Sequence, residues 1–464
     1  MDDRSCGQGP RSLPRLHRRC RPLRARESDA TVLTRRFTVE ERRARLARRH
    51  HLAPGSRARS ATEVARDLVG LHATDPATVF VAAWARMRDA TVAGIERELY
   101  DDRSLVRVLA MRRTAFVVPP EVAAIALAAC TRSVGQVQRR QLVHWIEQSG
   151  IGGDAGLWLK KVEDLTFEAV AARRHATASQ VSKDVPVLGR RLLLFEGTRN
   201  EAQVSLAPFV LRLLAVDGRL VRGRPRGGWL STQWSWATTR DWLGDDLRRW
   251  TIHEAQAELV RLWLRAFGPA TVDDVRWWTG WTLGEVRRAL TEVKPVEVDL
   301  GGTTGIALAG DLKPVRRPGP WAALLPGLDP TVMGWAERDW YLGPHRFALF
   351  DRSGNAGPTI WWDGRVVGGW AQRPNGEIRT RLLEDIGRDG KGAVEAEAER
   401  MRAWLGDRRV LPRFSTPLVR ELVSPPGPAA RPPHGVGRQA EVGAPASMPR
   451  SRTARPRNQR RPAG

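Results

Sequence analysis

Three side chains that can hold or orient a proton lie within four residues of one another: His72, Thr74 and Asp75. They belong to the stretch "DLVGLHATDPATVFVAAWARMR", residues 67–88, where a short break separates two apolar helical patterns. An imidazole, a hydroxyl and a carboxylate at this spacing can position a water molecule, and the carboxylate can take its proton or stabilise a nearby positive charge. The break therefore predicts a candidate catalytic site directly before a helix.

Each of these three residues also has an ordinary structural interpretation. Asp75 precedes Pro76, and such a pair is a strong helix start in which the carboxylate accepts from orphan backbone N–H groups. Thr74 can share that cap, and a histidine at a helix end is often a satisfied polar group beside the helix dipole. Both interpretations stay open, and the convergence of three such groups in one break favours a site.

The charge of the chain favours a polyanionic partner. Its 464 residues, enough for two or three domains, carry a formal net charge of +25 that comes almost wholly from arginine. More than half of this excess lies outside the two tails, residues 1–30 and 421–464. GC-rich coding can also produce an Arg-rich chain, but a basic body is typical of a protein that binds double-stranded DNA.

Several other classes are disfavoured. No apolar run approaches the roughly 18 residues of a membrane span, and the N-terminus lacks the apolar core of a signal peptide. The three cysteines, Cys6, Cys20 and Cys130, form no close pair, which argues against a disulfide framework and a zinc site. We expect a cytoplasmic protein, monomeric, with no metal, no cofactor and no membrane partner.

A motif that recurs three times predicts helix starts. Each copy has a hydroxyl residue followed three positions later by Glu, Gln or Asp, the spacing of a capping box. A single box of this kind usually means only that a helix begins, so the recurrence carries the argument. The copies are "SATEVARDL" at 60–68, "TASQVSKDV" at 177–185 and "TVDDVRWWT" at 271–279.

A strand-like hairpin follows each copy after further helices. "PVEVDLGGTTGIALAG" follows the third copy, "RLVRGRPRGGWLSTQW" the second, and "SLVRVLAMRRTAFVVP" the first. We therefore expect three tandem winged-helix units, each a helix-turn-helix with a β-wing. Beyond them, short strands between Gly and Pro turns at 321–372 predict a small β-barrel or sandwich, which a helix at 393–405 and a strand near 410–414 would complete.

The predicted fold class is thus α+β, with three winged-helix units, a C-terminal β-barrel and disordered basic tails, since the tails lack large apolar residues. The expected segments are a disordered basic tail (1–30), a first winged-helix unit with the HATD motif (31–120), a second unit (121–245), a third unit (246–315), the β-barrel with its closing helix (316–420) and a disordered Arg/Pro-rich tail (421–464).

Four passages in order resemble the winged-helix DNA glycosylases of the AlkZ and YcaQ type: "LVGLHATDPATVFVAAWARM", "DRSLVRVLAMRRTAFVVP", "LLPGLDPTVMGWAERDWYLG" and "GPTIWWDGRVVGGWAQR". The resemblance covers roughly residues 31–420. It implies three winged-helix units in a curved arrangement, a C-terminal β-barrel, and excision of bulky alkylated bases or unhooking of interstrand crosslinks.

The resemblance also implies a place for catalysis. In the family, the turn before the corresponding helix holds Gln, an apolar residue and then Gln or Asp, and the last of these positions the hydrolytic water. Alignment on the preceding Gly-Leu puts His72 on the first position and Thr74 on the last. Thr74 is no carboxylate, and the carboxylate follows one residue later at Asp75, so which of the two takes the catalytic place stays open.

Two functions remain. The first is a monofunctional DNA glycosylase that hydrolyses the N-glycosidic bond of alkylated or crosslinked purines, because no lysine that could form a Schiff base precedes Lys160. The second is a non-catalytic winged-helix DNA-binding or regulatory protein. Single arginines are commonly plain surface charges, but those near the break and on the predicted wings are candidate DNA contacts. They are Arg86, Arg88, Arg112, Arg113, Arg222, Arg224 and Arg226.

Overall fold

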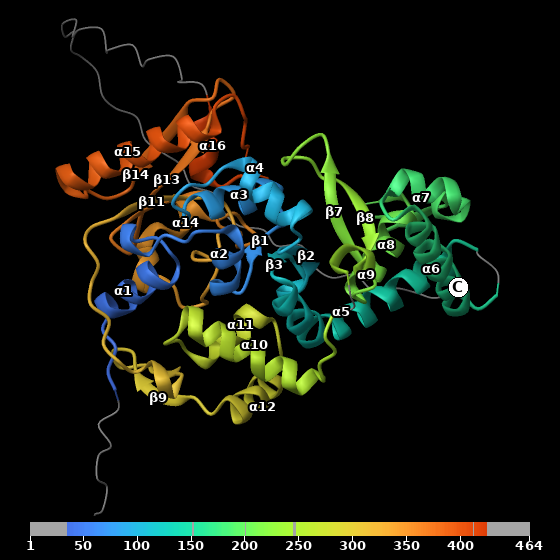
Figure 1. Ribbon diagram of the computed structural model, residues 1–464, viewed down its shortest axis with the longest axis horizontal. Coiled ribbons are helices and arrows are strands. Elements are labelled where there is room, and N and C mark those ends of the chain that lie inside the picture. Colours follow the sequence, from blue (N-terminus) through green and yellow to red (C-terminus); the bar gives the residue numbers. More distant parts are fainter. Residues whose placement is uncertain (1–34, 151–152, 200, 245–246, 412, 425–464) are drawn as a thin grey trace, which may run out of the picture. The chain divides into compact units, whose positions relative to one another are not determined.

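The computed structural model describes residues 35–150, 153–199, 201–244, 247–411 and 413–424 (Figure 1). The predicted tail at 1–30 and almost all of the tail at 421–464 lie outside these residues, as does the side chain of Arg113. Contacts divide the chain into Met1–Val423 and Ser424–Gly464, and only the first unit is discussed below.

The first part of the chain combines helices with a three-stranded sheet. The helices are α1 (Val39–Arg49), α2 (Ala61–Asp67), α3 (Pro76–Trp84) and α4 (Val92–Glu96), with short helical turns η1 (Pro54–Ser56), η2 (Arg97–Asp101) and η3 (Met111–Arg113). The antiparallel strands lie in the order β1 (Leu71–His72), β3 (Ala115–Val118), β2 (Val106–Leu109). The predicted turn between the last two strands is confirmed, because η3 joins them. Helices α2 and α3 pack against this sheet.

The second part has its own hydrophobic core. Its helices are α5 (Pro120–Gln148), α6 (Ala155–Arg173), α7 (Ala178–Asp184), α8 (Ala207–Val216) and α9 (Thr239–Leu243), with the turn η4 (Pro186–Gly189). One sheet has the order β4 (Ala176–Thr177), β8 (Gln233–Thr238), β7 (Leu220–Arg226), and a separate hairpin is formed by β5 (Arg191–Leu194) and β6 (Ala202–Ser205). The predicted Arg-rich hairpin is therefore confirmed as β7–β8.

The third part contains the expected helix, turn, helix and hairpin from Thr271 onwards, and a further helix, α10 (Ile252–Phe267), precedes them. The expected elements are α11 (Val272–Thr279), α12 (Leu283–Val293), β9 (Val296–Asp299) and β10 (Thr304–Ala307). All three copies of the recurring motif begin helices, α2, α7 and α11, as predicted. The boxes at Thr177 and Thr271 are reciprocal, whereas the Glu63 carboxylate accepts from the N–H of Arg59, one residue before the cap.

The C-terminal part of the first unit contains an open sheet. Its antiparallel strands are β11 (Ala322–Leu325), β12 (Thr359–Trp362), β13 (Arg365–Gln372) and β14 (Ile378–Leu382), joined in that order. Around them lie η5 (Ala309–Asp311), α13 (Asp339–Leu342), η6 (Gly343–His345), α14 (Arg346–Leu349), α15 (Gly387–Leu405) and α16 (Pro417–Val423).

The predicted β-barrel is not formed by the described residues, because β11 and β14 make no pair that would close the sheet. Helices cover the open sheet instead, because α15 packs against β11 and β14, and α16 packs against β13. The strand predicted near 410–414 is also wrong for the residues described there, and α16 extends the folded part to Val423, into the segment expected to be disordered.

A buried ion pair corrects the prediction for Arg86. Its guanidinium has no exposed area and binds Asp329 through two hydrogen bonds of 2.9 and 2.6 Å. It also donates to the Ala82 carbonyl and to the Thr331 hydroxyl. A side chain enclosed in this way cannot reach a DNA phosphate, so Arg86 is a structural residue. Arg88, two positions later, is exposed.

The Asp329→Ala variant should lower the free energy of unfolding by about 3–5 kcal/mol, because it leaves the Arg86 charge buried without a partner. Urea denaturation followed by circular dichroism measures this change. The control Arg88→Ala should change stability by less than about 0.5 kcal/mol, as surface substitutions usually do. Equal effects of the two substitutions would contradict the structural role of the pair.

Candidate active site

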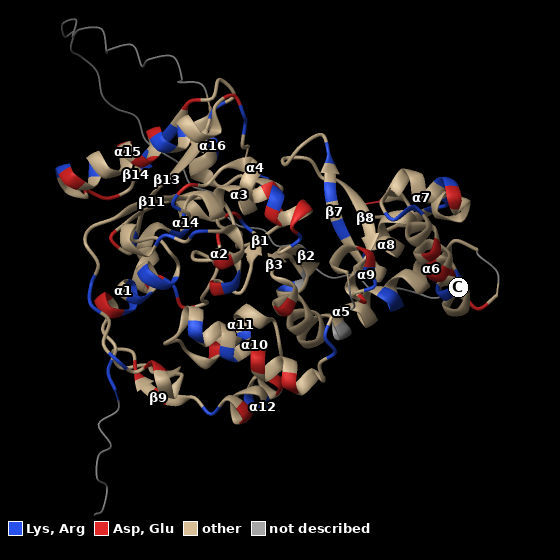
Figure 2. Ribbon diagram, in the orientation of Figure 1, with Lys and Arg blue, Asp and Glu red and all other residues tan. Residues whose placement is uncertain are grey.

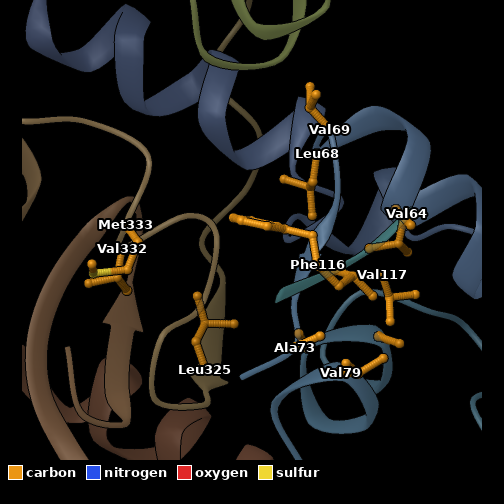
Figure 3. Packing of buried hydrophobic residues seen from close by; sticks show 14 of the residues in the cluster. Val64, Leu68, Val69, Ala73, Val79, Phe116, Val117, Leu325, Val332 and Met333 are labelled. Atoms are coloured by element: carbon orange, nitrogen blue, oxygen red, sulfur yellow. The ribbon is translucent and has the colours of Figure 1, made fainter. Parts of the chain in front are cut away.

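The three candidate residues lie at the end of β1, which holds His72, and in the loop between β1 and α3, which holds Thr74 and Asp75. His72 pairs with Phe116 of β3, and the N–H of Ala73 donates to the Ala115 carbonyl at 2.7 Å. Ala73 itself is buried in the hydrophobic cluster that contains Val79 and Val117 (Figure 3). Ala73 is thus buried between His72 and Thr74, and its pairing with β3 fixes the backbone of the loop.

His72 is a neutral imidazole in the interior. Its exposed fraction is 4%, and burial, followed by the positive charge of Arg112, lowers its pKa to about 3. The backbone N–H of Thr74 points to Nδ1 at 3.4 Å, so the ring hydrogen belongs on Nε2. His72 can therefore donate a hydrogen bond through Nε2, and it is no proton acceptor of useful strength at neutral pH.

Asp75 is the N-cap of α3, which confirms the capping interpretation. Its Oδ1 accepts from the N–H of Ala77 at 3.0 Å, and its Oδ2 from the N–H of Arg413 at 3.2 Å. Burial raises the pKa of this half-buried carboxyl in spite of these hydrogen bonds. Each carboxylate oxygen keeps a second lone pair, so capping does not exhaust what Asp75 can accept.

Thr74 is half-buried beside Asp75 and does not share its cap, since only the Asp75 carboxylate accepts from the start of α3. A small pocket lies next to these residues. Its lining comes from the start of α3, from the segment after β11, from β13 and the chain before β12, and from the chain before α16, and it includes Asp75, Thr78, Gly327, Trp370, Arg413 and Phe414.

Two arginines that the sequence reasoning missed hold the carbonyls of this loop. Arg107 on β2 donates to the Ala73 carbonyl at 2.8 Å, and Arg413 donates to the Thr74 carbonyl at 3.2 Å. Arg107 is buried and lies 4.3 Å from the ring centre of Trp234. A charged residue at the centre of the apolar strand "LVRVLA" is a signal that points to Arg107, whereas nothing local singles out Arg413.

The candidate DNA contacts do not form one cluster. Arg112 has a left-handed backbone (φ 49°) and its guanidinium lies 4.1 Å from the ring centre of Trp277, where burial lowers its pKa to about 10. The exposed Arg88 donates to the Arg57 carbonyl at 3.2 Å.

The three arginines of the β7–β8 hairpin lie along β7 rather than at the hairpin tip (Figure 2). Arg222 is half-buried against Trp236, and burial lowers its pKa to about 10. Arg224 is exposed but pairs with Asp101 at 2.8 Å, whereas Arg226 is exposed at the end of the strand. Arg226 is therefore the member of the three best placed to contact a phosphate.

One group of side chains has the geometry of metal ligands. Ligand atoms of His51, Glu63 and Asp67 lie within 4.8 Å of one another. The His51 ring already bridges the Ser56 carbonyl at 2.7 Å and the Asp67 carboxylate at 2.8 Å, and these contacts tie the end of α1 to α2. The arrangement is explained by this structural role.

Comparison with known proteins decides the family. A model of the "DNA glycosylase AlkZ-like" family matches residues 65–404. The chain belongs to this family. A relative from Streptomyces sahachiroi, an "Interstrand DNA cross-link repair glycosylase", is 25% identical over 375 residues, and the match covers 76% of this chain and 92% of the relative.

The solved structure of Streptomyces sahachiroi DNA glycosylase AlkZ also matches, with a TM-score of 0.61 and 24% identity over 81% of this chain and 99% of that chain. This likeness shows a shared AlkZ-like fold of mixed helix and sheet. No helix in the described part of the AlkZ-like chain is long and apolar enough to cross a membrane.

The pKa of His72 makes a prediction about acid stability. The unfolded chain protonates His72 near its ordinary pKa of 6.5, but the folded chain only near 3. The stability that the neutral, buried imidazole contributes to the folded state is therefore complete above pH 6.5 and is lost as the pH falls towards 3. In His72→Gln, the free energy of unfolding should fall less steeply over this range, by up to about 1.4 kcal/mol per pH unit. Urea denaturation at a series of pH values measures both slopes, and identical slopes would contradict a neutral buried His72.

Proposed function

We propose that this chain is a monofunctional DNA glycosylase that hydrolyses the N-glycosidic bond of alkylated or crosslinked purines in duplex DNA. The observation that carries the proposal is the Asp75 carboxylate, which lines a small pocket at the start of α3 and follows the neutral His72 by three residues, in a member of the AlkZ-like family. The purine class is supported by the resemblance and by the name of the curated relative, an interstrand cross-link repair glycosylase.

The chemistry fits a carboxylate better than a strong general acid. A purine alkylated at N7 or N3 is already cationic, so it leaves without being protonated, and the sugar develops oxocarbenium character. In our proposal Asp75 stabilises that charge and takes the proton of the attacking water. His72 orients the same water through its Nε2–H, and the Thr74 hydroxyl provides a further contact.

The distribution of lysines supports attack by water rather than by a lysine amine. The first lysine of the chain, Lys160, lies on α6 and pairs with Asp164 at 2.6 Å. A Schiff-base route needs a lysine amine within reach of the anomeric carbon, and no lysine adjoins the β1–α3 loop among the residues that line its pocket.

DNA binding by three tandem winged-helix units is part of the same proposal. Support comes from the order of elements in each part, above all α10, α11, α12 and the β9–β10 hairpin. In this proposal the protein acts as a monomer, and Arg88, Arg112, Arg224 and Arg226 contact the phosphates. The alternative, a non-catalytic DNA-binding protein, rests on Asp75 serving only as a helix cap.

The Asp75→Asn variant separates these two roles. Asparagine caps a helix nearly as well as aspartate, so the variant should stay folded and bind DNA like the parent. It carries no charge to face the transition state, so release of 7-methylguanine from duplex DNA should slow at least about 100-fold. Chromatography of the released base measures the rate.

The matched control is Asp154→Asn, because Asp154 caps α6 in the same way by accepting from the N–H groups of Gly156 and Leu157. This variant should release base at the parent rate. Base release by Asp75→Asn at the parent rate would refute the catalytic role and leave the capping role alone.

The pH dependence of base release tests which group titrates. Asp75 must be ionised, and its pKa is raised from 3.8, so the enzyme-dependent rate should fall as the pH drops through that raised pKa. His72, with a pKa of about 3, is neutral throughout this range, so His72→Gln should keep the same acidic limb at a lower rate. Subtraction of the rate without protein removes spontaneous depurination. An acidic limb near 6.5 that His72→Gln abolishes would contradict the assignment.

A further inference from the structure

A basic groove with one exposed aromatic ring lies outside the site described above. Phe347 on α14 is 88% exposed, more than any other large hydrophobic residue in the described part of the chain. A wide groove lies beside it, between α14, the turn after it and the start of α16. We call this the Phe347 groove, and its lining includes Arg346, Phe347, Phe350, Arg352, Ser415 and Arg420.

The charge of the Phe347 groove is positive. The three arginines in its lining are all exposed. Asp351 also lines it, but its carboxylate is occupied within its own turn, since it accepts from the N–H groups of Ser353 and Asn355 and from the Asn355 side chain at 2.8–2.9 Å. A positive groove with an exposed ring matches the combination that single nucleic-acid strands need, a charged track and a surface for stacking.

The Phe347 groove and the pocket beside Asp75 are lined by consecutive residues of one segment of the chain. The backbone N–H of Arg413 donates to the Asp75 carboxylate, Phe414 lines the pocket beside Asp75, and Ser415 lines the groove. Two residues of extended chain span at most about 7 Å. A DNA strand with one nucleotide at Asp75 can therefore place a neighbouring base step at the groove.

A second path of contacts joins the two places through alternating arginines and aromatic rings. The Arg112 and Arg338 guanidiniums lie 4.1 and 4.7 Å from the ring centre of Trp277. Arg338 and Arg346 lie 5.2 and 6.0 Å from the ring centre of Phe350, which lines the groove. This series of contacts begins at Arg112, whose charge, after burial, lowers the pKa of His72. It therefore connects α14 with the β1–α3 loop through packed side chains.

We propose that the Phe347 groove binds the DNA strand beside the target nucleotide, and that the Phe347 ring inserts at the neighbouring base step when that nucleotide is extruded. This inference rests on the proposed function and assigns it a positioning residue. Extrusion leaves an unstacked gap, and an exposed aromatic ring fills such a gap by stacking or by acting as an apolar wedge. Arg346 and Arg352 then contact the flanking phosphates.

The test uses the full chain and a duplex that cannot react. The duplex carries a tetrahydrofuran abasic site with 2-aminopurine as the adjacent base, and binding is followed by anisotropy and by 2-aminopurine fluorescence. Parent protein should raise the fluorescence several-fold as the base is unstacked from its neighbour. Phe347→Ala should abolish that rise and weaken binding about tenfold, whereas Phe347→Trp should retain both effects.

Leu157→Ala is the matched control, because Leu157 is 72% exposed on α6 and lines neither the groove nor the pocket beside Asp75. It should behave like the parent. The Arg346→Ala/Arg352→Ala variant should reduce the slope of log affinity against log salt by about 0.9 for each phosphate that it no longer neutralises. Parent-like fluorescence and affinity in Phe347→Ala would overturn the proposal. Binding to anionic lipid vesicles is measured with the same variants, and a Phe347→Ala variant that binds DNA like the parent but binds the vesicles less tightly would also overturn it, because the groove would then serve a lipid surface.

The outcome is separable from that of the proposed function. Unstacking that depends on Phe347 in a protein that releases no 7-methylguanine would support the groove and refute the glycosylase. If the parent protein releases base at a rate that Phe347→Ala leaves unchanged, and the 2-aminopurine fluorescence does not rise, the glycosylase proposal is supported and the groove proposal is refuted.

Discussion

The fold depends on one buried polar network. Arg86, which follows α3, binds the Asp329 carboxylate and the Thr331 hydroxyl, and that hydroxyl lies 2.8 Å from Nδ1 of His50 at the end of α1. The other ring nitrogen of His50 lies 3.2 Å from the Ala266 carbonyl on α10. Burial and the Arg86 charge keep the pKa of His50 well below its ordinary value, so the ring is neutral. The network joins four separate stretches of the chain, and because it is closed to solvent, the loss of one partner leaves another polar group buried without its hydrogen bond.

The candidate site follows from that constraint. The network holds the C-terminal end of α3, and Asp75 caps its N-terminal end, so the carboxylate is carried by a helix whose nine residues are all buried. Arg107 and Arg413 fix the two carbonyls before it. A rigid loop of this kind suits catalysis that needs a charge and a water at fixed positions. The exposed Phe347 ring, in contrast, lies on a four-residue helix at the surface, where a DNA strand can reach it.

Local signals predicted much of this architecture, and long-range contacts account for the rest. Capping boxes and hairpin turns depend on residues a few positions apart, so the starts of α2, α7 and α11 were predictable. The burial of Arg86 depends on Asp329, more than two hundred residues away, and no periodicity in the sequence indicates it. The open C-terminal sheet is a similar case, because its strands were predictable while their coverage by α15 and α16 was not. For the candidate site, the sequence predicted the loop before α3, whereas the contacts of Arg413 with that loop depend on residues more than three hundred positions apart.

The most direct test of the account is a product analysis of the parent protein with duplex DNA that carries 7-methylguanine. Free base, strand integrity and borohydride-trapped protein are measured in the same incubation. The account predicts release of 7-methylguanine, an intact strand with an abasic site, and no trapped adduct, because in the proposed mechanism water is the nucleophile and no lysine is among the described residues that line the pocket beside Asp75. A trapped protein–DNA adduct, or the absence of any released base, would contradict it.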